Sequence, residues 1–385
     1  MRRYRTRCLT WILTILLALS GVSAAYAEQP FDIQSKSAIL MDYETGTVLY
    51  EKDPHEKLQI ASVTKIMTIL LALEAIDEGK LKLDDTVTIS EYASSMGGSQ
   101  VFLHPGENLT VDALLKAIIV ASANDASVAM AEKLAGAHET FVARMNDRAR
   151  ELGMSNTNFM NATGLPAENG YSTAYDVALM SRELLKHPLF FRWSTIWTDT
   201  LEESKNKTEL ANTNRLIRFY EGTDGIKTGS TQDAGYCLSA TTKRGNMRLL
   251  SVVLSAPSTQ VRFSEATKLM DYGFANYETV PILKKDQVIQ GDIRVSGGKE
   301  EILNGIAPEA VGLLIKAGDS KEFEKEILLE EEIKAPIVKG QKVGTLNIKQ
   351  GEKIFQTMDI VSDREIDKAN IFDYFIKIFN NWVRK

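Results

Sequence analysis

The sequence predicts a mixed α+β protein, in which a sheet flanked by helices precedes a small all-β domain and a C-terminal amphipathic helix. Three observations support this. A hairpin pattern opens residues 28–275, a mostly helical stretch follows, and short strand patterns return from Gly225. After about Asn276, short alternating runs are separated by glycine and charge. The final residues are apolar at helical spacing. At roughly 150 residues per domain, 385 residues allow two domains.

The elements of residues 28–275 follow from local patterns. Residues 38–50, AILMDYETGTVLY, place two β-rich runs around a Thr45-Gly46 turn, which indicates a hairpin. A helix is expected from Ser62 to Ala75, and Thr110 is expected to cap a second apolar helix. Further amphipathic helices are expected over 137–152, 173–187 and 260–272, and strands at GIKTGS, AGYCLSATT and MRLLSVVLSA.

Residues 276–365 are predicted to form a separate β domain. Its alternating runs include VIQGDIRVSGG, AVGLLIKAGD and APIVKGQKVGTLNI. None of them contains a group of residues that performs chemistry. We therefore expect a spacer or an interaction module.

The two chain ends predict export and membrane attachment. Residues 1–27 have a basic start, an apolar run from Leu9 to Val22 and the small-x-small site Ala25-Tyr26-Ala27, so we expect a cleaved signal peptide. The alternative, an uncleaved anchor, is disfavoured because 14 apolar residues are fewer than the ~20 that span a bilayer. Residues 366–385 are predicted as a helix whose apolar face lies in the membrane surface, although packing on a protein core is an alternative. Together these patterns predict an exported protein, peripheral to the outer face of the cytoplasmic membrane or secreted.

Composition excludes several classes of protein. With 44% apolar and 25% charged residues, the chain is an ordinary globular protein. Its net charge is −6, and −10 without the four arginines of residues 1–27, so we expect no nucleic-acid partner. Removal of the signal leaves Cys237 alone, in a strand pattern that indicates packing, and no disulfide within the chain. The four histidines have no metal-ligand spacing, so neither a metal nor another cofactor is expected.

Ser62 and Lys65 are the first candidates for catalysis. A spacing of three at the start of a helix places the hydroxyl and the amine on one face, about one turn apart. A serine is a weak nucleophile, and a lysine that burial keeps neutral can accept its proton. The pair at Ser204 and Lys207 and the pair at Ser296 and 299 have the same spacing, but neither lies in an apolar helix.

Two further motifs follow in order. Ser122-Ala123-Asn124 offers a second hydroxyl to relay protons and an amide to hold a peptide. Lys227-Thr228-Gly229 begins a predicted strand and supplies a cation, a hydroxyl and an open backbone edge. Each motif is weak alone, since Ser204-Lys205-Asn206 matches the second as well. Three motifs in this order, each on a suitable helix or strand, favour a catalytic site over solvated polar residues in turns.

With these motifs the chain resembles the serine-type D-Ala-D-Ala carboxypeptidases, which are low-molecular-weight penicillin-binding proteins. The resemblance extends from about residue 34 to 346 and includes IASVTKIMT, ASANDA and GIKTGSTQDAGYCL. It implies a penicillin-binding, β-lactamase-like transpeptidase domain with an antiparallel sheet. It also implies removal of the terminal D-Ala from peptidoglycan stem peptides through an acyl-enzyme, and inhibition by β-lactams.

The resemblance also implies residue roles. Ser62 would be the nucleophile, Lys65 its base, and Ser122 the group that protonates the leaving amine. Lys227 would raise the local potential and Asn124 would bond the substrate amide. The terminal carboxylate would be held by Thr228 and by Arg262, in QVRFSEATKLMDYGF, and the backbone N–H groups of Ser62 and Ser230 would form the oxyanion hole beside Gly229. Some relatives have histidine where this chain has Ser230, and the change is expected to be mild if the backbone N–H is the group that acts.

Three other functions remain as alternatives. A β-lactamase would need a glutamate that activates the deacylating water, and Glu168 lacks the E-x-x-x-N setting. A non-catalytic penicillin sensor would be expected to carry membrane spans or a signalling domain. An endopeptidase that cuts cross-links would use the same residues, and the sequence does not distinguish it from a carboxypeptidase.

Overall fold

The computed structural model describes residues 31–376. The predicted signal peptide and the last nine residues of the predicted C-terminal helix lie outside this range. Across residues 31–376, no helix combines the length and the apolar character that a membrane crossing needs. Two hydrophobic cores are present, one drawn from residues 39–254 and one from residues 283–366.

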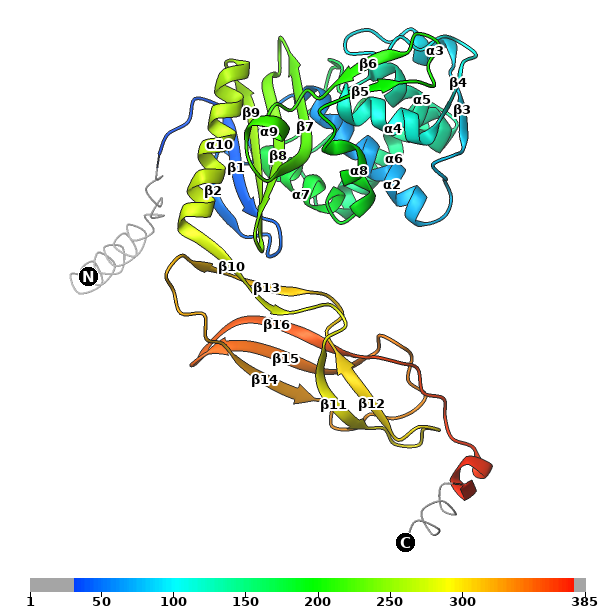
Figure 1. Ribbon diagram of the computed structural model, residues 1–385, viewed down its shortest axis with the longest axis vertical. Coiled ribbons are helices and arrows are strands. Elements are labelled where there is room, and N and C mark those ends of the chain that lie inside the picture. The colour runs from blue at the N-terminus through cyan, green and yellow to red at the C-terminus, as the bar shows by residue number, and fades with distance from the viewer. Residues whose placement is uncertain (1–30, 377–385) are drawn as a thin grey trace, which may run out of the picture. The chain divides into compact units, whose positions relative to one another are not determined.

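A five-stranded antiparallel sheet forms the centre of the first part, in the order β2-β1-β9-β8-β7 (Figure 1). The predicted antiparallel sheet is therefore confirmed. The opening hairpin joins the later strands because β1 pairs with β9 along its whole length. β7 lies at one edge, so one side of its backbone faces away from the sheet. The strands are β1 (Ser37–Asp42), β2 (Val48–Lys52), β7 (Thr223–Thr231), β8 (Gly235–Arg244) and β9 (Met247–Ala256).

Helices cover both faces of this sheet (Figure 1). α10 packs on β8 and β9, and α7 packs on β9 and β1 from the other side. α2 packs against α7, and α4, α5 and α6 pack against α2. The longer helices are α2 (Lys65–Asp77), α4 (Val111–Val120), α5 (Asn124–Ala135), α6 (His138–Glu151), α7 (Ala174–Leu184) and α10 (Thr259–Asn276). The short elements are η1 (Ala61–Thr64), α3 (Glu91–Ser94), η2 (Pro188–Phe190), α8 (Phe191–Ser194), α9 (Leu216–Phe219) and the strand pairs β3 (Thr86–Thr88) with β4 (Asn108–Thr110) and β5 (Thr198–Leu201) with β6 (Thr208–Ala211).

Two elements differ from the sequence prediction. Ser62 lies in the 3₁₀ turn η1, and the α-helix begins only at Lys65. Ala61 enters this turn with φ of +46°, a left-handed conformation that a regular helix start does not use. α5 was not predicted, because its first eight residues are all buried and so have no amphipathic period. Thr110 does cap α4, since its hydroxyl accepts the N–H of Ala113 at 3.2 Å.

From residue 277 to residue 370 the second part consists of strands, turns and loops, without a helix. A five-stranded sheet has the order β11-β12-β16-β15-β14, and β10 pairs with β13. Ile366 is buried in its core, and the helical residues begin at Ile371, five residues after the predicted boundary. The strands are β10 (Tyr277–Leu283), β11 (Val288–Arg294), β12 (Ile302–Ile306), β13 (Val311–Lys316), β14 (Glu324–Leu329), β15 (Lys342–Gln350) and β16 (Lys353–Ser362).

Asp42, at the end of β1, is a buried carboxylic acid. One carboxyl oxygen accepts long hydrogen bonds of 3.4 Å from the N–H and the hydroxyl of Thr45. The other oxygen has no hydrogen-bond partner among the described residues. Burial raises the pKa of Asp42 to about 6 from 3.8, because removal from water disfavours the charged form.

Replacement of this acid is expected to stabilise the protein at neutral pH. Because the folded state holds the proton more tightly than the unfolded chain, stability falls as the pH rises from about 4 through 6. Asp42→Asn removes this loss and should raise the free energy of unfolding at pH 7 by on the order of 2 kcal/mol. Urea unfolding at pH 4.5 and 7 measures the effect, and an equal pH slope in both proteins would contradict it.

Candidate active site

The three sequence motifs meet at a cleft of about 540 Å³ along the free edge of β7. Ser62, Ser122, Thr228, Gly229, Ser230 and Arg262 line it, together with Ser99, Trp197, Ala211, Asn212, Thr213, Arg215, Thr259 and Phe263. Lys65, Asn124 and Lys227 are buried. Hydrogen bonds link Lys65 to Ser62 and Asn124, and Lys227 directly precedes the cleft residue Thr228.

Ser62 and Lys65 are in direct contact. The Lys65 Nζ lies 2.9 Å from the Ser62 Oγ, so the contact joins the second residue of the 3₁₀ turn to the first residue of α2. Nζ also donates to the Asn124 Oδ1 at 2.6 Å and to the Thr163 carbonyl at 2.7 Å. The lysine side chain is completely buried.

Burial holds the pKa of Lys65 well below its usual range, and the nearby Lys227 lowers it further. The Asp125 carboxylate acts in the opposite direction. A neutral amine has two N–H groups and one lone pair. The carbonyl oxygens of Asn124 and Thr163 can only accept, so they use the two N–H groups. The lone pair then faces the Ser62 hydroxyl, whose proton it can accept.

The second motif lies at the junction of α4 and α5. Ser122 has φ of +63° and is 3% exposed, so a strained backbone carries its hydroxyl into the cleft. Asn124, the first residue of α5, donates from Nδ2 to the Gly97 carbonyl at 2.7 Å and so turns its oxygen toward Lys65. The buried Asp125 accepts the N–H groups of Val101 and Leu103, which holds the loop over residues 97–103.

The third motif brings β7 against the Ser62 turn. A Cβ on Gly229 would lie 2.8 Å from the Ile60 carbonyl oxygen and 2.9 Å from the Ser62 nitrogen, so only glycine fits without movement of the backbone. The Thr228 hydroxyl donates to the Thr213 hydroxyl at 2.7 Å. Burial, together with the charge of Arg262, lowers the pKa of Lys227 to about 7.

Arg262, near the start of α10, supplies a buried cation at the same cleft. Its Nη1 donates to the carbonyls of Gly229 and Cys237, both at 3.2 Å, and its Nε has no hydrogen-bond partner among the described residues. The guanidinium stacks on Phe263, 4.6 Å from the ring centre. Burial lowers its pKa to about 10, which leaves it charged at neutral pH.

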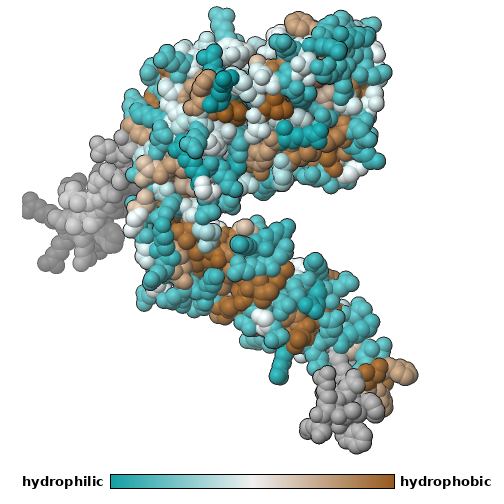
Figure 2. Space-filling view, viewed as in Figure 1, coloured by the Kyte–Doolittle hydropathy of each residue, from teal (hydrophilic) through white to brown (hydrophobic). Residues whose placement is uncertain are grey.

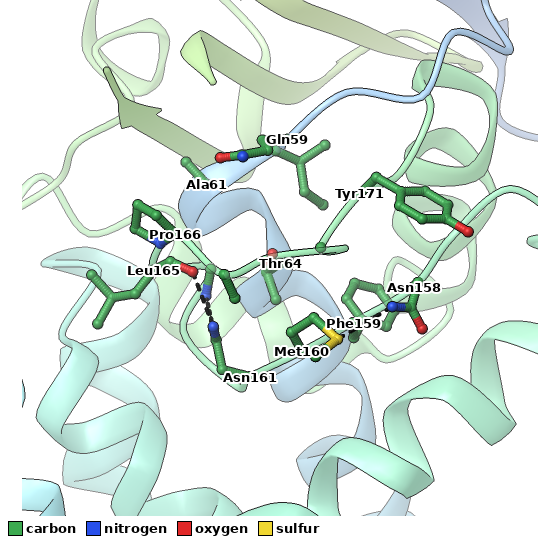
Figure 3. Close-up of a pocket in the computed structure, with 14 residues that line it drawn as sticks. Gln59, Ala61, Thr64, Asn158, Phe159, Met160, Asn161, Leu165, Pro166 and Tyr171 are labelled. Carbon is green, nitrogen blue, oxygen red and sulfur yellow. Dashed lines mark hydrogen bonds between the residues drawn. The ribbon is translucent and has the colours of Figure 1, made fainter. Parts of the chain in front are cut away.

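A loop over residues 158–171 folds against the Ser62 turn (Figure 3). Asn161 organises it, since Oδ1 accepts the N–H groups of Thr163 and Gly164 and Nδ2 donates to the Leu165 carbonyl at 2.9 Å. Gly164 has φ of +78°, and a Cβ there would lie 1.8 Å from the Ala61 carbonyl oxygen. This contact aims the Thr163 carbonyl at Lys65.

Sequence reasoning missed several residues that complete the site. The Thr163 carbonyl, the Thr213 hydroxyl and the Asp125 carboxylate each hold a motif residue or the loop beside it. Asp125 directly follows the second motif and was available as a signal. Thr163 and Thr213 act through contacts between segments far apart in the sequence, which no local pattern reveals.

Comparison with known proteins agrees with this geometry. A family model described as D-alanyl-D-alanine carboxypeptidase matches residues 23–258, and one described as the C-terminal domain of penicillin-binding protein 5 matches residues 277–368. The D-alanyl-D-alanine carboxypeptidase DacF of Bacillus subtilis is 42% identical over 386 residues, which cover 98% of this chain and 99% of that protein.

Solved structures agree as well. The penicillin-binding protein 5 structure from Haemophilus influenzae is 32% identical, with a TM-score of 0.73 over 89% of this chain and 100% of that one. The ampicillin-bound penicillin-binding protein D2 of Listeria monocytogenes is 33% identical, with a TM-score of 0.57 over 63% of this chain and 98% of that one. The chain therefore belongs to the D-alanyl-D-alanine carboxypeptidase family of low-molecular-weight penicillin-binding proteins.

Proposed function

We propose that this protein is a serine-type D-Ala-D-Ala carboxypeptidase that removes the terminal D-Ala from peptidoglycan stem peptides. The observation that carries the proposal is the buried Lys65 amine, which has two carbonyl acceptors and the Ser62 hydroxyl around it. This arrangement supplies a base at the nucleophile without a histidine. Family membership fixes the reaction class in which such a pair is used.

In the first step Ser62 attacks the carbonyl of the penultimate D-Ala, and its proton passes to the Lys65 amine. The negative oxygen that forms is stabilised by the backbone N–H groups of Ser62 and Ser230. The close approach of Gly229 to the Ser62 nitrogen supports this role, because it brings the two segments side by side.

The leaving amine then needs a proton. Ser122, which lines the cleft with Ser62, is the group proposed to pass it on as the C–N bond breaks. Asn124 is proposed to bond the substrate amide in addition to Lys65. Water then attacks the ester, and Lys65 serves as base a second time, which frees Ser62 and the shortened peptide.

An exopeptidase must recognise the free end of its substrate. The proposed clamp for the terminal carboxylate consists of the Thr228 hydroxyl and the Arg262 guanidinium, with Lys227 as a second positive charge. The unpaired Nε of the buried Arg262 supports this assignment, since a buried donor without a partner is costly. Positioning of this end selects the last peptide bond.

Penicillins are proposed to acylate Ser62 in place of the peptide. The ampicillin-bound relative from Listeria monocytogenes supports this, as does the name of the family. Since Ser230 stands where some relatives have histidine, its contribution is expected to come from the backbone N–H, which either residue supplies.

The protein is also proposed to act outside the cytoplasm and to attach to the membrane surface through its C-terminal helix, as a peripheral protein. Ile371, Phe372 and Phe375 are 77%, 78% and 72% exposed, and Figure 2 shows apolar atoms at this end of the described chain. Exposed aromatic side chains of this kind favour insertion between lipid headgroups.

The activity test measures D-alanine released from diacetyl-Lys-D-Ala-D-Ala by the mature chain. Ser62→Ala is expected to release none, because the nucleophile is absent. Ser296→Ala is the matched control, since it alters an exposed serine in another Ser-x-x-Lys sequence and should keep full activity. Release by Ser62→Ala, or none by the parent, would refute the proposal.

The pKa of Lys227 predicts how acylation depends on pH. Lys227 acts as a cation, and its pKa of about 7 means that its charge is lost as the pH rises through 7. The second-order rate constant for acylation of Ser62 by penicillin should therefore fall above pH 7. Lys227→Arg should keep the charge and flatten the profile up to pH 9, with a lower maximum because the guanidinium is larger. The same alkaline fall in both proteins would show that another group titrates.

Membrane attachment is tested by deletion of residues 371–385. Ile366 and Asp367 are retained, because their backbones bond Ile337 and Lys299 within the β part. The truncated mature protein should move to the soluble fraction on sedimentation with vesicles, while its release of D-alanine stays at the parental rate. A full-length Phe372→Asp, Phe375→Asp variant should bind more weakly. Unchanged pelleting of both variants would refute this attachment.

A further inference from the structure

The cleft continues past the proposed carboxylate clamp into a second hollow, of about 530 Å³. Its lining, which we call the Phe219 shelf, consists of Arg215, Leu216, Phe219, Thr259, Gln260 and Phe263. Arg215, Thr259 and Phe263 line both hollows, so the two are continuous. None of the three sequence motifs contributes to this shelf.

The shelf lies at the Thr228 end of the cleft. Thr213 is joined to Thr228 by their hydroxyl groups, and Asn214 donates to the Gly225 carbonyl at 2.9 Å. These contacts fix the segment that leads into α9 alongside β7. Arg262 directly precedes Phe263 of the shelf. The residues proposed to hold the substrate carboxylate are therefore next to it.

An aromatic side chain is held in the open on this shelf. Phe219 is 71% exposed and lines the second hollow, so its ring is available to an apolar ligand. Its ring meets that of Trp197 edge to face at a centroid distance of 6.0 Å, and the Arg218 guanidinium lies over both rings. These contacts fix the position of Phe219 before any ligand binds.

We propose that the Phe219 shelf binds the side chain of the C-terminal D-amino acid of the substrate, and that the enzyme accepts apolar and aromatic residues there as well as alanine. This inference rests on the proposed function. The side chain branches from the same carbon as the carboxylate, so a clamp at Thr228 and Arg262 places it beside the shelf. A methyl group leaves most of this hollow unfilled, whereas a benzyl group reaches the aromatic wall.

The chemistry is the same for both substrates. Ser62 forms the ester with the penultimate D-Ala, the C–N bond breaks, and D-phenylalanine leaves with the proton that would otherwise go to D-alanine. Water then hydrolyses the ester. Only the contact of the leaving residue with the shelf changes, so the effect should appear as a ratio between substrates.

The experiment compares diacetyl-Lys-D-Ala-D-Phe with diacetyl-Lys-D-Ala-D-Ala, with the released amino acid measured by chromatography. The parent should cleave the D-Phe peptide with a kcat/KM within about tenfold of that for the D-Ala peptide. Phe219→Ala should lower the D-Phe to D-Ala ratio by roughly tenfold, the size of effect that apolar contacts give in a specificity pocket. Phe219→Leu, which keeps an apolar surface, should lie between them.

The matched control is Tyr92→Ala, which removes an exposed aromatic side chain outside both hollows and should keep the parental ratio. Calorimetry measures the binding of both peptides to the Ser62→Ala variant. This gives a second readout that needs no turnover. The proposal is overturned if D-alanine but not D-phenylalanine is released, or if Phe219→Ala changes both rates equally. If neither is released, the proposed function itself fails, and the shelf assignment fails with it.

Discussion

The removal of the Lys65 amine from water is the constraint on which the site depends. A charged ammonium in this position would have to give up its hydration without a carboxylate in hydrogen-bond contact, because its hydrogen-bond partners are two carbonyl oxygens and a hydroxyl. The neutral amine fits the same partners without that cost. The 3₁₀ turn, the second motif and the 158–171 loop each contribute one of the three oxygens, so the proposed base is enclosed only where all three segments meet.

Two glycines permit that meeting. Gly229 lets an edge strand lie against the Ser62 turn, and Gly164 lets a loop cross the Ala61 carbonyl. Each position excludes a side chain by contact with backbone, which cannot rotate away as a flexible side chain would. The scaffold therefore sets the geometry mainly through backbone contacts, and the reactive side chains are carried on rigid elements.

Much of this arrangement could be predicted from the sequence. The opening hairpin, the strands around Lys227 and Cys237, and the helix capped by Thr110 have local patterns that the structure confirms. α5 could not be predicted from the sequence, because its first eight residues are all buried and have no amphipathic period. The Phe219 shelf was equally hidden, since α9 is four residues long and its role depends on its distance from β7. The sequence named the motif residues that meet at the cleft as candidates, whereas it did not reveal Thr163 and Thr213, which reach those residues only through tertiary contacts.

The pairing of β1 with β9 has a consequence for the unfolded chain. Residues 37–42 must wait for residues 247–256, more than two hundred positions later, before the sheet can close. Contacts of such high sequence separation form slowly and late. In the unfolded chain Lys65 is in water and carries its proton at neutral pH like any other lysine, so it could not accept the Ser62 proton. If Ser62 is the nucleophile as proposed, it is therefore inert in a nascent or unfolded chain and becomes reactive only when Lys65 is buried in the folded protein.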